Sequence, residues 1–286
     1  MHRIRIQHLT EYLFSSPVTL NPHRLLVRPR EGHDVRIESS RLEISPAYNI
    51  KWYRDVFDNS LALVSFLQPA NRLTIASDVV IQHYEDTPLN FSLEDYAVSY
   101  PFTYKEGERI DLAAFQQPVF ANDQPMVQRW LQDIGLYSGI METLSLESKL
   151  NHAIHSQFRY RVREQAGVQS PAQTLSLGSG SCRDYATLFI EACRCLGLAS
   201  RFVSGYLHAP ATEAGNASTH AWAEVYIPGK GWLGFDPTVG EVAGNRHIAV
   251  AVARNPESVP PVSGSFIGPN RYAPRMVVNV QVNRLT

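Results

Sequence analysis

The sequence predicts an α+β protein in which a β-rich, sandwich-like N-terminal domain precedes a domain of helices followed by antiparallel strands. Three observations lead to this prediction. The first ninety residues carry strand patterns, helical periodicity starts near residue 123, and strand-like segments return after residue 200. We therefore divide the chain into a β-rich domain (1–90), a connector with one helix (91–142) and a core domain (143–286).

The composition excludes several classes of function. The chain has 286 residues, of which 44% are hydrophobic and 19% charged, and its formal net charge is -1. No long basic run is present, so we expect neither nucleic acid nor a membrane surface as a partner. The start, MHRIRIQHLTEYLF, lacks the continuous apolar segment of a signal peptide, and no stretch reaches the roughly 18 apolar residues of a membrane span. Three cysteines, an odd and sparse set, predict a cytoplasmic protein with free thiols.

The N-terminal strands are predicted from alternation of side-chain polarity. The relevant segments are RIRIQHL, VRIESSRLEI, SLALVSFL and RLTIASDVVIQHY. Turn signals separate them, and RDVFDNSLALVSF has the pattern of a hairpin that turns near Asp58 and Asn59. Short strands with few helical signals predict an antiparallel sandwich or a small barrel.

Three helices follow in the sequence pattern. NDQPMVQRWLQDIGL has Asp123 as an N-cap and Pro125 near the first turn. TLSLESKLNHAIHSQF repeats apolar residues every three to four positions, and a third helix starts at Cys182. Strands are then predicted in SRFVSGYLH, STHAWAEVYI, GWLGFDPTV and RMVVNVQVN.

Cys182 lies where a helix start would activate a thiol. Ser181 is a suitable N-cap, Asp184 three positions later makes a weaker form of the capping box, and Gly197 is placed to end the helix. The first helical position carries about half a positive charge and unpaired N–H groups, which stabilise a thiolate and can bind an oxyanion. The alternative is an ordinary buried thiol, because a cysteine at a helix start is not specific by itself.

The other two cysteines are predicted to be buried hydrophobic residues. Cys193 follows Cys182 by eleven residues, which is about 16 Å along a helix axis. A disulfide requires Cα atoms within about 7 Å of each other, so this pair cannot be bridged. We expect the same role for Cys195.

A base for the thiol is predicted in the segment STHAWAEVYI. Alternation places small aliphatic residues on one face of this strand and His220, with Trp222, on the other. Asp236 in the next strand, GWLGFDPTV, is positioned to orient the imidazole as the third member of a triad. The alternatives are a half-buried strand histidine and an aspartate in a turn.

The position of Asp236 depends on the loop between these strands. A four-residue loop, PGKG, would pair Ala223 with Asp236 and place the carboxylate on the wrong face. An odd-length loop or a bulge would place Asp236 on the face of His220. We predict such an irregularity.

A metal site is not predicted. His152 and His155 are three residues apart on a predicted helix and could share a metal ion. No third ligand occurs at a recognisable spacing. The ordered set of Cys182, His220 and Asp236 is stronger evidence for a site than any one of its members.

Several motifs resemble the transglutaminase-like superfamily, which includes bacterial proteins described as cysteine proteases. The core resembles it in GSGSCRDYATLFIEACRCLGLASRFVSGYL, STHAWAEVYIPGKGWLGFDPT and NRHIAVAVARNPESVPPVSGSFIG. SPVTLNPHRLLVRPR and YRDVFDNSLALVSF resemble the β-rich domain that precedes this core in bacterial members. The resemblance implies a papain-like core, with the cysteine helix packed on an antiparallel sheet, and a catalytic triad of Cys182, His220 and Asp236.

The resemblance also implies the chemistry. The thiolate would attack a carboxamide of a peptide or protein, and water or a primary amine would resolve the thioester. Tyr160 is a candidate second oxyanion donor, and Trp222 a candidate residue of the site lining. No calcium-loop pattern is present, so no metal or other cofactor is expected.

Two classes of function stay open from the sequence. The leading prediction is cysteine-dependent acyl transfer on amides, as transamidation, deamidation or proteolysis. The alternative is a non-enzymatic protein-binding module on a core that has lost its activity. The N-terminal domain could position a substrate or act as a scaffold, and the sequence leaves the substrate and the oligomeric state open.

Overall fold

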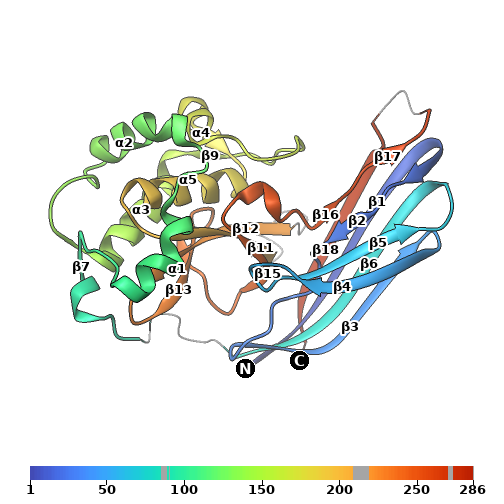
Figure 1. The fold of residues 1–286 in the computed structure, drawn as a ribbon, viewed down its shortest axis with the longest axis horizontal. Helices are drawn as coiled ribbons and strands as arrows, with labels where there is room; N and C mark the ends of the chain where they lie inside the picture. The colour runs from blue at the N-terminus through green and yellow to red at the C-terminus, as the bar shows by residue number, and fades with distance from the viewer. Residues whose placement is uncertain (85–88, 90, 209–218, 270–272, 286) are drawn as a thin grey trace.

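The two ends of the chain lie side by side in one sheet. In the computed structural model, β1 (His2–Leu20) pairs antiparallel with β18 (Arg275–Leu285) over eleven residue pairs. The N- and C-termini are therefore neighbours (Figure 1). The structure describes residues 1–84, 89, 91–208, 219–269 and 273–285.

The first part of the structure is a sandwich of two antiparallel sheets, which we call the sandwich lobe. One sheet has the order β17-β1-β6-β3, with β18 also on β1, and the other has the order β16-β2-β5-β4. Apolar residues from both sheets, including Val18, Leu25, Val64 and Leu73, form a buried core between them. The strands besides β1 and β18 are β2 (His23–Leu25), β3 (Val35–Ser45), β4 (Tyr48–Arg54), β5 (Ser60–Phe66), β6 (Ala70–His83), β16 (Val262–Ser263) and β17 (Phe266–Ile267).

The second part, the core lobe, packs helices on a five-stranded antiparallel sheet of order β14-β13-β12-β11-β15. The strands are β11 (Ser200–Leu207), β12 (Thr219–Ile227), β13 (Gly231–Asp236), β14 (Glu241–Val242) and β15 (His247–Ala253). The helices are α1 (Glu106–Gln116), α2 (Gln124–Asp133), α3 (Thr143–Gln157), α4 (Pro171–Leu177) and α5 (Cys182–Cys195). The predicted α+β class, with a sandwich before a helix-on-sheet core, is confirmed.

Short elements complete the core lobe. They are β7 (Ser99–Tyr100) paired with β8 (Met141–Glu142), β9 (Arg159–Tyr160) paired with β10 (Ser179–Gly180), and the 3-10 turns η1 (Asp95–Ala97), η2 (Ala121–Asp123) and η3 (Pro256–Ser258).

Two details of the predicted organisation are wrong. The segment 262–285, assigned to the core domain, supplies β16, β17 and β18 to the sandwich lobe. The connector 91–142 holds two α-helices, α1 and α2. Alternation predicts that a segment is a strand but not which distant strand it pairs with. In α1 only Leu112 is buried, so this helix does not need the continuous apolar face that would mark it in the sequence.

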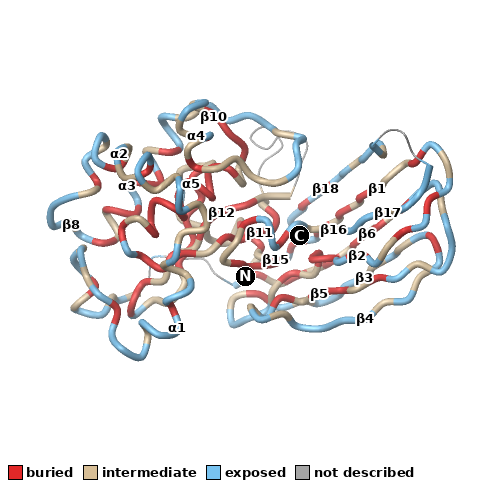
Figure 2. Tube along the Cα trace, turned by 45° about the horizontal axis from the view of Figure 1, so that its top comes forward, coloured by how far each residue is buried: buried red, intermediate tan, exposed pale blue. Residues whose placement is uncertain are grey.

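Helix α5 is the centre of the core lobe. Every residue from Asp184 to Arg194 is buried, and the helix packs on β12 and β11. Figure 2 shows buried chain concentrated here, whereas the outer parts of the sandwich lobe are largely exposed. Glu191 and Arg194 form a fully buried ion pair of 2.6 Å, and Arg194 also donates to backbone carbonyls. Removing one partner of such a pair costs about 3–5 kcal/mol.

The two lobes share one apolar core. The cluster around α5 includes Ile4, Ile6 and Ile81 of the sandwich lobe. At the same boundary, His8 Nδ1 lies 2.9 Å from the Tyr206 hydroxyl, and both side chains are buried. The lobes are therefore held by packing and by buried polar contacts. In the described residues, the helices are too short or too polar to cross a membrane.

We predict that Glu147 of α3 makes stability depend on pH. The residue is 1% exposed, its carboxyl oxygens have no hydrogen-bond partner among the described residues, and burial raises its pKa well above the ordinary 4.5. Above pH 4.5 the unfolded chain releases this proton and the folded protein keeps it, so stability falls as pH rises. Glu147→Gln should raise the melting temperature at pH 7.5.

The pH dependence separates this effect from simple repacking. The gain in unfolding free energy should grow between pH 5 and pH 7.5, by up to about 1.4 kcal/mol per pH unit. Denaturant unfolding at several pH values measures it, with the exposed Glu164→Gln as control. A gain that is equal at every pH would contradict the prediction.

Candidate active site

The start of α5 is fixed by a buried carboxylate. Asp184 Oδ2 accepts hydrogen bonds from the Ser181 backbone N–H (2.8 Å) and hydroxyl (2.7 Å), which confirms Ser181 as the N-cap. Arg163 pairs with the same oxygen at 2.7 Å, and the Gln169 N–H donates to Oδ1. Burial raises the pKa of Asp184, but Arg163 and the N–H donors outweigh it and lower the pKa. This network ties the segment 163–169 to the helix start.

Cys182 is the first residue of α5 and is half-buried. Cys182, His220 and Tyr160 line the same cleft, and the thiol contributes to the raised pKa of both His220 and Tyr160. The sulfur therefore shares a cleft with an imidazole from β12 and a phenol from β9, and it lies at the positive end of a helix.

The hairpin of β12 and β13 has an odd-length loop, one of the two predicted irregularities. Ile227 pairs with Gly231, so the loop consists of the three residues 228–230. The turn uses positive φ angles of 95° at Gly229 and 84° at Gly231, which favour glycine. Further along the register Ala223 pairs with Phe235, so Asp236 falls on the opposite face, which is that of His220.

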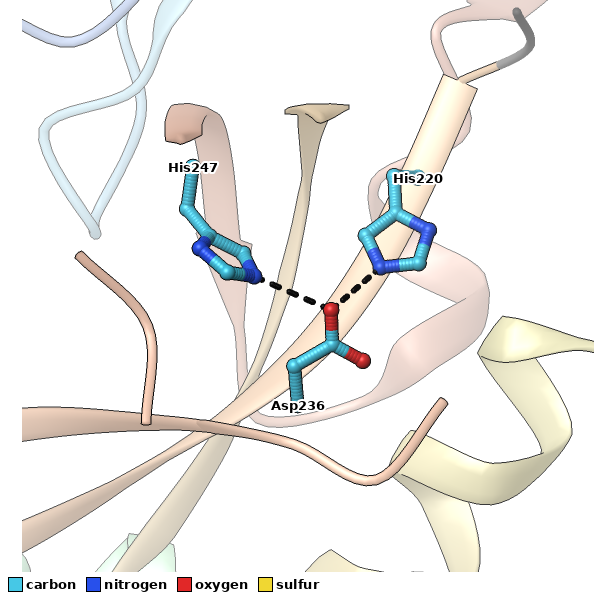
Figure 3. Close-up of side chains that lie close together, drawn as sticks. All are labelled: His220, Asp236 and His247. Carbon is cyan, nitrogen blue, oxygen red and sulfur yellow. Dashed lines mark hydrogen bonds and ion pairs between the residues drawn. The ribbon is translucent and has the colours of Figure 1, made fainter. Parts of the chain in front are cut away.

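The imidazole and the carboxylate are in direct contact (Figure 3). His220 Nε2 lies 2.6 Å from Asp236 Oδ2, which leaves Nδ1 as the ring nitrogen for Cys182. The side chain of His220 is 10% exposed and that of Asp236 is 0% exposed. Burial lowers the pKa of His220, but Asp236 and Cys182 outweigh it and raise the pKa to about 10. The sequence-predicted residues Cys182, His220 and Asp236 are thus brought together.

Asp236 has a second imidazole partner that the sequence reasoning missed. His247 Nε2 lies 3.0 Å from the same oxygen, Oδ2, and the Thr238 N–H donates to Oδ1 at 2.9 Å. Burial raises the pKa of Asp236, but His220, and then His247, outweigh it and lower the pKa. The only signal for His247 was its presence in the motif NRHIAVAVARN, since its distance from Asp236 in the sequence follows no general spacing rule.

His220, Asp236 and His247 also have the side-chain types and the spacing of a possible metal site. One ligand atom from each of His220, Asp236 and His247 lies within 4.8 Å of the others. However, His247 Nδ1 accepts a hydrogen bond from the Gly244 N–H, so Nε2 carries the proton and has no lone pair for a metal. The separations from the carboxylate, 2.6 and 3.0 Å, are those of hydrogen bonds. The group is therefore a hydrogen-bonded network.

Tyr160 and Trp222 have different positions in the site. Tyr160, in register with Gly180 through the β9–β10 pair, lies in the cleft beside Cys182, and its pKa is raised by burial and by the neighbouring thiol. Trp222 is buried, stacks on the His220 ring with centroids 6.2 Å apart, and is not among the described residues of the cleft lining. It packs behind the imidazole, so its predicted place in the lining is corrected.

The remaining candidates lie away from the thiol. Cys193 is fully buried in the apolar core, as predicted, and Cys195 packs against that core while partly buried. On α3, the His152 and His155 ring centroids are 6.3 Å apart, and His155 Nδ1 lies 3.0 Å from the Thr238 carbonyl oxygen.

The thiol opens into a cleft of about 580 Å³. Cys182, His220 and Tyr160 line it, together with residues of the segment 162–168 and of the proline-containing segment 256–262. This volume is in the range of small-ligand sites. The cleft can therefore admit a peptide side chain to the sulfur.

Comparison with known families identifies this arrangement. The family model of the transglutaminase-like superfamily matches residues 135–237, and that of the bacterial transglutaminase-like N-terminal region matches residues 4–82. The chain belongs to the transglutaminase-like superfamily. The first match ends one residue after Asp236, so it contains all three residues of the site.

Individual proteins extend this family assignment. An uncharacterized protein of Mycobacterium tuberculosis is 28% identical over 279 residues, which cover 92% of this chain and 87% of the relative. A protein-glutamine gamma-glutamyltransferase of Pseudomonas aeruginosa is 38% identical over 92 residues, 29% of this chain and 14% of that protein. Among solved structures, a candidate cysteine protease from Cytophaga hutchinsonii matches with a TM-score of 0.77 at 19% identity, covering 100% of this chain and 91% of that chain. The last match shows that the two chains share a fold.

We predict that iodoacetamide labels Cys182 selectively at pH 7.5, at least about tenfold faster than the other two thiols. Burial raises the pKa of Cys193 well above its ordinary value and also raises that of Cys195, so both stay protonated and slow. Peptide mapping by mass spectrometry measures the three rates. His220→Ala should slow the labelling of Cys182 about tenfold, whereas His152→Gln should not. Equal labelling of all three thiols would refute the assignment of Cys182.

Proposed function

We propose that this protein is a cysteine-dependent enzyme of acyl transfer on amides, which attacks a carboxamide of a peptide or protein through a thioacyl-enzyme intermediate. The observation that carries the proposal is the convergence of Cys182, His220 and Asp236 at a cleft of about 580 Å³. The superfamily and the fold support cysteine-based acyl transfer or hydrolysis in general. The similarity to a protein-glutamine gamma-glutamyltransferase supports glutamine side chains as the acyl donor.

Acylation follows from the arrangement of the thiol and the imidazole. The Cys182 sulfur donates an electron pair to the carboxamide carbon, and a C–S bond forms as the carbonyl π-electrons move to oxygen. The tetrahedral intermediate then breaks its C–N bond. The nitrogen leaves as ammonia, or as an amine from a peptide bond, after taking a proton from His220. The raised pKa of His220, about 10, means that this proton is present at neutral pH.

Deacylation reverses the roles of the same groups. The now neutral imidazole of His220 takes a proton from water or from a primary amine, whose oxygen or nitrogen bonds to the thioester carbon. The C–S bond breaks, and the Cys182 thiolate and the His220 imidazolium are restored. Asp236 holds the ring by its Nε2–H and stabilises the imidazolium without exchanging a proton. Water yields hydrolysis or deamidation, and an amine yields transamidation.

Two donors are placed to stabilise the oxyanion. The Cys182 backbone N–H lies in the first turn of α5, where it has no intrahelical acceptor. The Tyr160 hydroxyl lies beside the thiol, and its raised pKa keeps it protonated as a donor. We propose these two groups as the oxyanion site.

The second candidate function is protein binding without catalysis. A core that has lost its activity would not need a buried ionised carboxylate held against an imidazole next to an accessible thiol. Here Asp236 is 0% exposed and accepts three hydrogen bonds, and replacing such a buried ionic group by apolar residues is often neutral or stabilising, so protein binding alone gives no reason to keep it. These contacts favour the enzyme.

The cytoplasmic location stays a prediction from the cysteine content.

We predict ammonia release from glutamine-containing peptides by the wild-type protein. A peptide panel is incubated with and without a fluorescent primary amine, and ammonia, amine incorporation and new peptide termini are measured. Because Cys182 supplies the covalent step, Cys182→Ala should reduce every product by about 10³-fold or more. Asp236→Asn should also lose most activity, because the carboxylate of Asp236 holds the His220 imidazole in place.

The products distinguish the open reactions. Ammonia alone indicates deamidation, incorporated amine indicates transamidation, and new termini indicate proteolysis. His152→Gln, remote from the cleft, is the control that should retain wild-type rates. Turnover that persists in Cys182→Ala would reject the proposed mechanism.

A further inference from the structure

Two imidazoles meet at one carboxylate oxygen of Asp236. Figure 3 shows His220 from β12 and His247 from β15 on either side of this oxygen, with a hydrogen bond from each. The proposed mechanism uses only the first of these contacts. The second is a buried polar contact whose side chain is nearly inaccessible, so it calls for an explanation of its own.

The direction of the second hydrogen bond is determined. His247 Nδ1 accepts from the Gly244 backbone N–H at 3.2 Å, so the proton of the neutral ring is on Nε2. Nε2–H therefore donates to Asp236 Oδ2 at 3.0 Å. His247 acts toward Asp236 as a fixed, neutral donor.

Packing holds the His247 ring in this orientation. The indole of Trp222 contacts it edge to face, with ring centroids 5.2 Å apart and an interplanar angle of 72°. The same indole stacks on His220, so one side chain restrains both imidazoles. His83 Nε2 lies 3.2 Å from the His247 carbonyl oxygen, and His83 is the last residue of β6 in the sandwich lobe.

The sandwich lobe also holds the strand that begins at His247. The buried Asn59 side chain donates to the Val252 carbonyl (2.8 Å) and accepts from the Val252 N–H (2.9 Å), which imitates a strand pairing. The Arg30 backbone N–H donates to the Ala249 carbonyl at 2.8 Å. Strand β15 is an edge strand of its own sheet, and the sandwich lobe bonds to backbone groups of three of its residues, His247, Ala249 and Val252.

We propose that His247 is a positioning residue for the proposed reaction: it holds the Asp236 carboxylate so that His220 stays directed at Cys182, and the sandwich lobe contributes by fixing β15. The inference rests on the proposed function and extends it beyond the three triad residues. With Thr238 on Oδ1 and two rings on Oδ2, the carboxylate cannot rotate without losing a bond. Without the His247 ring, buried Asp236 Oδ2 loses one of its hydrogen-bond donors, and the carboxylate can rotate more easily.

The test compares two replacements of similar size. In His247→Gln the terminal amide nitrogen lies close to the position of Nε2 and can donate to Asp236, whereas His247→Met fills the space without a donor. The substrate-independent readout is the rate constant for alkylation of Cys182 by iodoacetamide at pH 7.5. We expect a loss of about tenfold in His247→Met and less than about twofold in His247→Gln, the size expected for one charge-assisted hydrogen bond.

The values of kcat and KM for ammonia release from a glutamine-containing peptide provide a second readout. His247 is not among the described residues of the cleft lining, so His247→Met should lower kcat and leave KM unchanged. His83→Leu, which removes the sandwich contact to the His247 carbonyl, should lower kcat in the same direction, and His83→Gln should restore it. Should His247→Met fail to fold, His247→Asn replaces it, since its shorter amide cannot reach Asp236.

Each outcome decides one question. Wild-type labelling and kcat in His247→Met or His247→Asn would overturn the positioning role while leaving the proposed function intact. Equal losses in the Gln and Met variants would also overturn it, because the donor would not matter. Activity that is independent of Cys182 would instead reject the proposed function.

Discussion

The ionised carboxylate of Asp236, fully enclosed by protein, is the feature on which the site depends. A buried charge without partners costs several kcal/mol, and this cost is offset only when its lone pairs are filled. The donors are the His220 ring from β12, the His247 ring from β15 and the Thr238 backbone after β13. Because the donors come from three segments, the carboxylate is stable only after the sheet has assembled. The conditions that stabilise Asp236 are therefore the conditions that align His220 with Cys182.

The sandwich lobe is connected to the site through strand β15, which carries His247. The strand pairs with β11 on one side, and Asn59 and Arg30 of the sandwich lobe bond to the backbone groups of Val252 and Ala249. The shared apolar core, which includes Ile6 next to the buried His8–Tyr206 contact, leaves little freedom between the lobes. These contacts support a scaffold role for the lobe. A scaffold role also has a physical reason, because a movement of β15 would displace His247 and, through it, the Asp236 carboxylate of the triad.

Local signals in the sequence predicted the parts of the site that local chemistry determines. Ser181 and Asp184 defined the start of α5 because a capping box is a contact within one turn. The alternation of side chains predicted either an odd-length loop or a bulge in this hairpin, since otherwise Asp236 would point away from His220, and the structure has the odd-length loop. What the sequence could not give was tertiary pairing. The return of β18 to β1 joins the two ends of the chain, and the contact of His247 with Asp236 depends on where β15 docks, which no spacing rule encodes.

The three cysteines show why residue type alone could not identify the site. All lie on α5, yet Cys193 faces the apolar core, and its pKa is raised by burial and by nearby Glu147. Cys195 near the helix end is also shifted upward by burial. Only Cys182 combines a helix N-terminus, an imidazole and an opening to solvent. Reactivity is therefore a property of position, and the same helix that supplies a positive end to one thiol places another in surroundings where a thiolate is unfavourable.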